Sequence, residues 1–203
     1  MASVDDTGPA PRRQNSEDLA TYIRAHGLAA TVVPEVDPAT LPPGSAIVKS
    51  IVLMAGDAPL VAVVLLTDRV EERKIADILK LARRRVRLAK PEEVVRHTGF
   101  VVGTVPPFGH ICEIPTLVDT AVMRMCRLYG GGGDPDREVE VGATELLAYC
   151  RGRVVDIAMA AAAPPEESEE DVIKAAGARL PLPWPKDGTL VSLVCVVATR
   201  RCV

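Results

Sequence analysis

The segment GFVVGTVPPFGH, residues 99–110, combines residue types that could present backbone groups to a ligand. Pro106 and Pro107 fix their own φ angles and stiffen the chain, while Gly103 and Gly109 permit unusual φ values and close approach. A stiff loop at the end of a strand can direct free N–H groups at a carbonyl oxygen, as an oxyanion hole does. The residues alone leave two interpretations open: an ordinary turn, or a loop that binds a ligand.

Two further features could bind an anion. Lys49 stands in the otherwise apolar stretch AIVKSIVLM, where a lysine either follows a sheet edge to water or projects into a cleft. Residues 130–133 are four consecutive glycines, whose N–H groups could surround a phosphate. A strand rather than a helix follows them, and this favours a flexible hairpin turn.

Residues 69–90 carry nine Lys or Arg against three acidic residues, in a chain whose formal net charge is −3. Such a local cluster is a candidate footprint for a phosphate backbone. The alternative is a solvated helix face with ion pairs four residues apart. No aromatic residue interleaves with these cations, so stacking on single-stranded bases is not indicated.

Other catalytic patterns are missing from the sequence. There is no GxSxG, HExxH, P-loop or GxGxxG motif after a strand, and the three histidines are too scattered for a metal site. The five cysteines fit no zinc pattern and are expected to be reduced thiols. Cys112 is close to His110, but no orienting acid accompanies them, which leaves a cysteine hydrolase a weak hypothesis. With no apolar signal core or membrane span, a cytoplasmic protein is predicted.

Several elements must position these residues. Hydrophobic periodicity and capping residues predict helices over 15–27, 68–82, 90–99 and 143–150. Alternating or continuous apolar runs predict strands over 30–36, 46–56, 59–67, 84–89, 99–103, 116–123, 125–133, 137–141 and 188–201. The run 59–67 is apolar on both faces and should be a central strand. The mixture predicts an α+β fold with a mixed, partly closed, barrel-like sheet flanked by helices.

Three segments are expected along the chain. Residues 1–14 are predicted to be a disordered leader and residues 15–162 the main domain. Residues 163–203, an acidic loop and a last strand, are expected to pack on that domain.

Four landmarks in this order resemble the YbaK/ProX-type aminoacyl-tRNA editing domains, the superfamily that includes the insertion domain of bacterial prolyl-tRNA synthetases. They are the strand lysine Lys49, the helix over 89–95, the G-x-x-x-P-F-G motif of residues 103–109, and the strand-end Asp119. The glycine turn and acidic strand of residues 130–141 form a looser fifth match. The resemblance covers roughly residues 16–160.

The resemblance implies hydrolysis of the ester that joins a wrong amino acid to tRNA, without metal or cofactor. An aminoacyl ester is reactive and the terminal ribose offers a neighbouring hydroxyl, so a positioned water and oxyanion donors suffice. The implied partners are the tRNA acceptor end and, as a second candidate, an aminoacyl-tRNA synthetase, but neither DNA nor a membrane. The alternative is an inactive tRNA- or synthetase-binding module of the same fold, suggested by the all-glycine turn.

Site roles follow from the same resemblance. The N–H groups near Gly103 and Thr104 would hold the carbonyl, Pro107 would stiffen the loop, and Lys49 would bind the phosphate or terminal adenosine. The expected substrate-binding residues are Phe108, Gly109, His110, Gly131, Gly132 and Glu138. Glu138 and Glu140 share one face of their strand, so either could be the family's acidic position. Asp119 is expected to be a structural hydrogen-bond acceptor.

Overall fold

The computed structural model describes residues 12–159, which form four α-helices and eight strands. The helices are α1 (Ser16–Ala25), α2 (Glu72–Leu79), α3 (Pro91–Thr98) and α4 (Ala143–Tyr149). The strands are β1 (Ala30–Pro34), β2 (Ser45–Ala55), β3 (Ala58–Leu65), β4 (Val86–Leu88), β5 (Thr116–Asp119), β6 (Arg127–Gly131), β7 (Arg137–Gly142) and β8 (Arg153–Val155). Short 3₁₀ turns lie at Pro38–Thr40 (η1), Arg83–Arg85 (η2) and Val122–Arg124 (η3).

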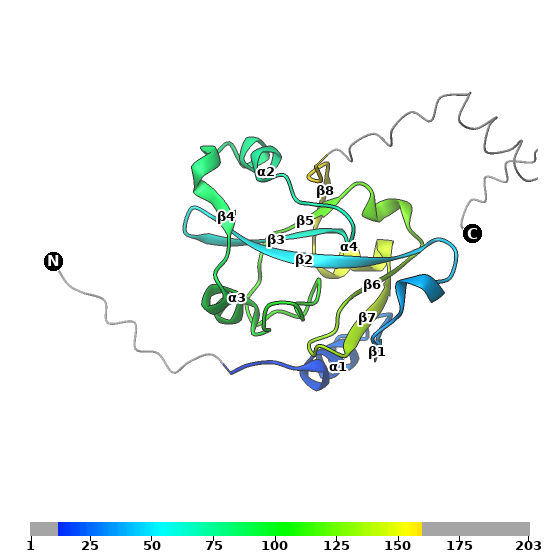
Figure 1. Ribbon diagram of the computed structural model, residues 1–203. Helices are drawn as coiled ribbons and strands as arrows, with labels where there is room; N and C mark the ends of the chain where they lie inside the picture. Colours follow the sequence, from blue (N-terminus) through cyan, green and yellow to red (C-terminus); the bar gives the residue numbers. More distant parts are fainter. Residues whose placement is uncertain (1–11, 160–203) are drawn as a thin grey trace, which may run out of the picture. The chain divides into compact units, whose positions relative to one another are not determined.

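The strands form one mixed sheet in the order β1-β7-β6-β2-β3-β5-β8, with β4 paired to β2 (Figure 1). The pairs β2–β6, β3–β5 and β5–β8 are parallel and the others are antiparallel. The two ends of this order, β1 and β8, are not paired to each other, so the sheet stays open. The predicted α+β class with a mixed sheet is confirmed.

Strand β3 lies inside the sheet, between β2 and β5, and is buried on both faces. Val61 and Val63 belong to one hydrophobic core, whereas Ala62 and Val64 belong to another. This division follows from the alternation of side chains along a strand. The prediction of a central strand from its two-sided apolar run is therefore confirmed.

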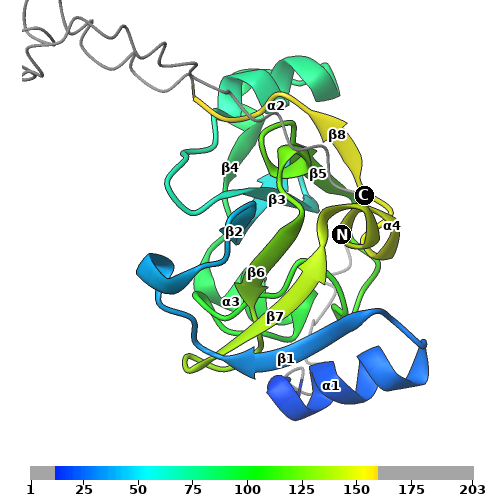
Figure 2. The ribbon, with the colours of Figure 1, turned by 90° about the vertical axis from the view of Figure 1, so that its right-hand side faces the viewer.

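The two cores lie on opposite faces of the β2–β3 pair. The larger one is covered by α1, α3 and α4. The smaller one is covered by α2 and includes Val86 of β4. Figure 1 shows α2 and α3 on opposite sides of the pair, and Figure 2 shows α1 running beside β1. Both cores consist mainly of Val, Leu and Ile, as the low aromatic content of 3% requires.

Helix α1 begins where its sequence predicts. The Asn15 side chain accepts hydrogen bonds from the N–H groups of Glu17 and Asp18, each at 3.1 Å. Asp18 in turn accepts from the Asn15 N–H at 3.2 Å, which completes a capping box. The helix then buries Leu19 and Ile23 in the larger core.

Some predicted elements are wrong or shorter than expected. Residues 99–103 form no strand, because Gly99 ends α3 with a φ of 84° and a tight turn follows at Thr104. The helix expected over 68–82 is confined to α2, since Lys80 takes a left-handed conformation that ends it. The three-residue strand β8 was not predicted, being too short to show a period.

Two predicted segments lie largely or wholly outside the part of the chain that the structure describes. Most of the predicted leader over 1–14 lies outside the described residues 12–159. The predicted extension over 163–203 lies wholly outside them. Among the described residues, no helix combines the length and apolar character that crossing a bilayer requires.

Candidate functional site

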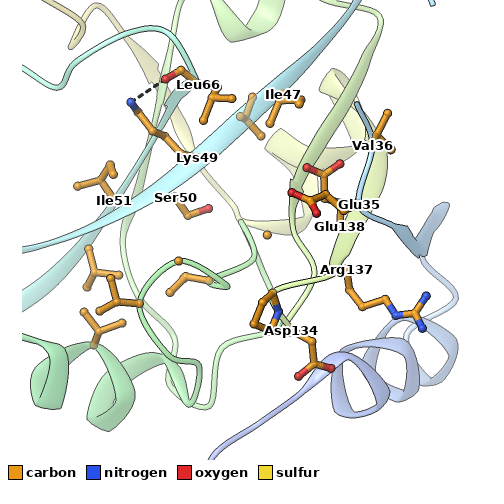
Figure 3. Close-up of a pocket in the computed structure, with 18 of the residues that line it drawn as sticks. Glu35, Val36, Ile47, Lys49, Ser50, Ile51, Leu66, Asp134, Arg137 and Glu138 are labelled. Carbon is orange, nitrogen blue, oxygen red and sulfur yellow. Dashed lines mark hydrogen bonds between the residues drawn. The ribbon is translucent and has the colours of Figure 1, made fainter. Parts of the chain in front are cut away.

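A pocket of about 590 Å³ opens where β2 lacks a neighbour on one side (Figure 3). Strand β2 pairs with β6 over residues 45–47 and with β4 over residues 53–55. Between these partners, Lys49, Ser50 and Ile51 line the pocket. Another wall is formed by Val102, Gly103 and Val105 together with Val94 of helix α3, and the β6–β7 hairpin supplies a third.

The loop that follows α3 is fixed at both ends by buried rings. Phe100 is fully buried, and its N–H donates to the hydroxyl of Thr98 at 3.0 Å. Phe108 packs edge-on against Tyr149, with ring centroids 5.6 Å apart. Between these anchors, Gly103 has a φ of 92°, and a Cβ there would meet no atom within 4 Å. Glycine is therefore required at this position by conformation, not by crowding.

The two N–H groups expected to hold a carbonyl differ in availability. The Thr104 N–H donates to the carbonyl of Val101 at 3.1 Å, which closes a turn. The Gly103 N–H has no acceptor within residues 12–159. The structure thus leaves the amide of Gly103, and not that of Thr104, unused at the pocket wall.

Lys49 reaches the rim of the pocket. Its ammonium donates to the carbonyl of Leu66 at 2.8 Å (Figure 3). The Lys49 side chain is only partly buried. It therefore lies at the edge of the pocket and is not enclosed within it. A phosphate at the rim could replace Leu66 as its acceptor with little rearrangement.

The glycine run is explained by close approach of backbone segments. A Cβ on Gly131 would lie 2.5 Å from the carbonyl oxygen of Val105, and one on Gly132 would lie 2.7 Å from the backbone of Arg137. Gly133 has a φ of 96°, and a Cβ there would lie 2.7 Å from the Asn15 backbone. Of the three, only Gly131 lines the pocket. The run therefore packs the hairpin tightly rather than forming a flexible turn.

The two candidate acids of strand β7, Glu138 and Glu140, have different surroundings. Glu140 accepts from Arg127 at 2.7 Å, outside the pocket. Glu138 lines the pocket, and its Oε2 is buried with no hydrogen-bond partner within residues 12–159. Burial raises the pKa of Glu138, the backbone of Val36 opposes this shift, and the negative charge of Glu35 adds to it.

Replacing Glu138 with glutamine is expected to raise the melting temperature at neutral pH. The folded-state pKa is raised, so the charged form is penalised above it, while below the unfolded-state value no penalty exists. The difference between variant and wild type should be near zero at about pH 4 and grow towards about pH 8. Partial exposure limits the gain to a few degrees at about pH 8. Thermal unfolding across this range checks it, and a lower melting temperature at high pH would contradict it.

Four predicted site residues lie elsewhere. Pro107, Phe108, Gly109 and His110 line a second hollow of about 450 Å³, which shares no lining residue with the first. The His110 Nε2 is 2.9 Å from the carbonyl oxygen of Pro106. Burial lowers the pKa of His110, and this hydrogen bond opposes the shift. The pocket thus brings together Lys49, Gly103, Gly131 and Glu138. The four residues of the second hollow do not line it, and neither do Thr104 and Gly132.

Asp119 is a structural acceptor, as predicted. Its carboxylate accepts three backbone N–H groups, from Ala121, Ile157 and Ala158, at 2.8 to 2.9 Å. Only 2% of the residue is exposed, and it does not line the pocket.

The basic segment over 69–90 contains both cations held in ion pairs and cations without an ionic partner in the described part of the chain. Arg87 donates to both carboxylate oxygens of Glu93, and this ion pair is the main reason why the pKa of Glu93 falls to about 2. Arg83 pairs with Glu72, and Lys74 with Asp156. The cations that are exposed and form no ion pair within residues 12–159 are Arg69, Arg73, Lys80, Arg84 and Lys90. These five remain available to an anionic partner.

Metal and thiol chemistry find little support among residues 12–159. No group of three or more His, Cys, Asp or Glu side chains there is arranged to hold a metal ion. Cys112 and Cys150 are free thiols, and burial raises the pKa of Cys150 to about 11. Cys126 is disulfide-bonded, so the expectation of reduced cysteines is wrong for this residue.

Sequence reasoning missed several residues of the pocket. Glu35 lies in a region where no role could be assigned, while Ser50 is the second polar residue in the apolar run around Lys49 and could have been noticed. The Ser50 hydroxyl is buried with no partner within residues 12–159. An apolar rim also surrounds the opening, formed by Leu66, Leu88 and Val102, which are 46%, 60% and 60% exposed.

Comparisons with known proteins place this chain in a family. The family model of the aminoacyl-tRNA editing domain matches residues 26–149. The chain therefore belongs to the aminoacyl-tRNA editing domain family, and the resemblance drawn from its landmarks is confirmed.

Solved structures share the fold. One is described as a proposed trans-editing enzyme for prolyl-tRNA synthetase, with 24% identity and a TM-score of 0.61, covering 76% of this chain and 99% of that one. A hypothetical protein has 26% identity and a TM-score of 0.61, covering 70% and 99%. A third, from work on computational grafting of epitopes onto scaffold proteins, has 21% identity and a TM-score of 0.65, covering 76% and 99%.

Proposed function

We propose that this editing domain acts in trans as a deacylase, hydrolysing the ester of mischarged aminoacyl-tRNA in the pocket beside β2. The observation that carries the proposal is the unused N–H of Gly103 at the wall of a pocket that also contains Lys49 and Glu138. The family assignment supplies the reaction class.

The proposed mechanism needs no nucleophile from the protein. Water attacks the ester carbonyl, the bond from the acyl carbon to the ribose oxygen breaks, and that oxygen leaves with a proton. The neighbouring ribose hydroxyl orients the water, and the Gly103 N–H stabilises the developing oxyanion, a contribution of roughly 3–4 kcal/mol for a well-placed donor. Metal and cofactor have no part in this scheme.

Lys49 is proposed to anchor the terminal nucleotide. Its ammonium already lies at the rim, where it can exchange the Leu66 carbonyl for a phosphate oxygen. Of the exposed cations of the basic segment, Arg84 and Lys90 flank β4, whose Leu88 forms part of the same rim. These cations are proposed to contact the acceptor stem.

The proposal is tested with proline tRNA charged with alanine, cysteine or serine. At least one of these esters should be hydrolysed faster than in buffer, and Lys49→Ala should lower kcat/KM by about 10-fold or more. Arg153→Ala is the matched control, because Arg153 is an exposed cation on β8, away from the pocket. Buffer-level hydrolysis of all three esters would refute the proposal, as would an unchanged rate in Lys49→Ala.

One observation favours a second candidate, an inactive module that binds tRNA or a synthetase. The Thr104 N–H is already used in a turn, which leaves a single amide for the oxyanion. Binding of tRNA that weakens steeply with salt, without turnover of any ester, would support this alternative.

A further inference from the structure

Two carboxylates meet at one end of the pocket. Glu138 on β7 lies opposite Val33 of β1, and Glu35 follows Val33 by two residues. Side chains two apart along an extended chain share a face, so Glu35 and Glu138 are diagonal neighbours. The Glu35 N–H donates to the Asp136 carbonyl at 2.9 Å, which continues the β1–β7 pairing. Figure 3 shows the two carboxyl groups together.

No cation of the described residues neutralises this pair. Neither Glu35 nor Glu138 forms an ion pair within residues 12–159. Arg137, the neighbour of Glu138, lies 3.9 Å from Asp136 instead, and Lys49 is bonded to Leu66. Asp134, the third acid at the pocket, accepts from the Ser16 N–H.

Glu35 is exposed, whereas Glu138 is partly buried, and its surroundings make its uncompensated charge costly. Val36, Ile47 and Val48 line the same pocket with apolar surface. A buried carboxylate oxygen without a donor, such as Glu138 Oε2, is unfavourable unless a ligand supplies one. A ligand that brings a positive charge and N–H donors would supply the missing donor to Glu138 Oε2 and pair with the charge of Glu35 at the same time.

We propose that Glu35 and Glu138 bind the free α-ammonium group of the aminoacyl ester. This inference rests on the proposed function, since it concerns the same pocket and substrate. Every aminoacyl ester carries its ammonium on the carbon next to the carbonyl, so a group held near Gly103 brings its ammonium to the same pocket. The site therefore selects for an unblocked amino group and rejects esters whose amine is acylated.

The test compares alanyl-tRNA with N-acetylalanyl-tRNA, both on proline tRNA and each normalised to its own rate in buffer. Wild type should accelerate hydrolysis of the free-amine ester about 10- to 100-fold more than that of the acetylated one. Glu35→Gln and Glu138→Gln should lose most of this preference by slowing the free-amine reaction alone. Glu140→Gln is the control, because Glu140 lies on the same face of β7 but outside the pocket.

A binding measurement removes the dependence on turnover. The probe is adenosine bearing a 3′-alanylamino group, an amide that resists hydrolysis, with its N-acetyl form as comparison. Calorimetry should show binding of the free amine at least about 10-fold tighter in wild type, and not in Glu138→Gln.

The outcomes separate the two proposals. If wild type accelerates both esters equally, the ammonium subsite is wrong while the deacylase proposal stands. If neither ester is accelerated and the two amide probes bind equally, both proposals fail. If neither is accelerated but the free-amine probe binds more tightly, the subsite stands and the deacylase proposal fails. The expected thermal stability of Glu138→Gln excludes misfolding as the cause of a lost preference.

Discussion

Replacing Asp119 with alanine is expected to lower the free energy of unfolding by about 3–5 kcal/mol. The change removes the acceptor of three backbone N–H groups in a site that is 2% exposed. Each buried donor left unsatisfied costs roughly 1–3 kcal/mol, and part of this loss is recovered where water enters the vacated space. Because Ile157 and Ala158 follow β8, the variant should also loosen the edge of the sheet that β8 forms.

Denaturant unfolding measures the effect, and Asp156→Ala is the matched control. Asp156 is in the same segment and bonds to Lys74, but its side chain is 68% exposed. Its removal should change the free energy of unfolding by no more than about 1 kcal/mol. Similar losses in the two variants, or a loss below about 1 kcal/mol for Asp119→Ala, would contradict a stabilising role for the three hydrogen bonds that the Asp119 carboxylate accepts.

The parts of the fold that the sequence predicts are those specified by local patterns. The capping box that starts α1 lies within four residues, and the two-sided apolar run of β3 is visible in the strand itself. Both features are determined by residues adjacent in the chain. The mixed sheet follows from the presence of such strands among amphipathic helices.

The wrong strand over 99–103 shows where local patterns fail. Phe100 is buried as it would be in a strand, yet Val102 is 60% exposed and the backbone turns between Val101 and Thr104. A short apolar run indicates that a segment is buried. It does not distinguish a buried strand from a buried loop, because both have the same apolar residues. Only the tertiary partners of this segment, such as Gly131, distinguish the two cases.

The pocket exists because strand β2 has no strand partner among the described residues on one side over a few residues, and no local sequence pattern predicts such a gap in the sheet. Strand β2 changes partner from β6 to β4, and the interval between them holds Lys49 and Ser50. The family resemblance led to Lys49, Gly103 and Glu138, which all line this pocket. It also led to Phe108 and His110, which neighbour Gly103 in sequence but line the other hollow, because the loop passes between the two.

Replacing Gly131 with alanine is expected to disrupt the pocket. The new Cβ would lie 2.5 Å from the carbonyl oxygen of Val105 and 2.8 Å from the Thr104 backbone, separations that only movement of the main chain can relieve. Gly131 also pairs directly with Glu138, so the shift would reach both the loop that carries Gly103 and the acidic end of the pocket. The expected cost in unfolding free energy is about 1–3 kcal/mol.

The effect on hydrolysis should exceed the effect on stability. A displacement of about 1 Å at a group that orients the substrate can lower the rate on the order of 100-fold, even when the protein stays folded. Gly130→Ala is the matched control, because a Cβ there would meet the side chain of Val48 at 3.1 Å and would lie 3.8 Å from the nearest backbone atom, the carbonyl oxygen of Val48. Single-turnover deacylation and thermal unfolding of both variants measure the two effects. If Gly131→Ala hydrolyses the ester as fast as Gly130→Ala, then the contact between β6 and residues 104–105 does not position the reacting groups.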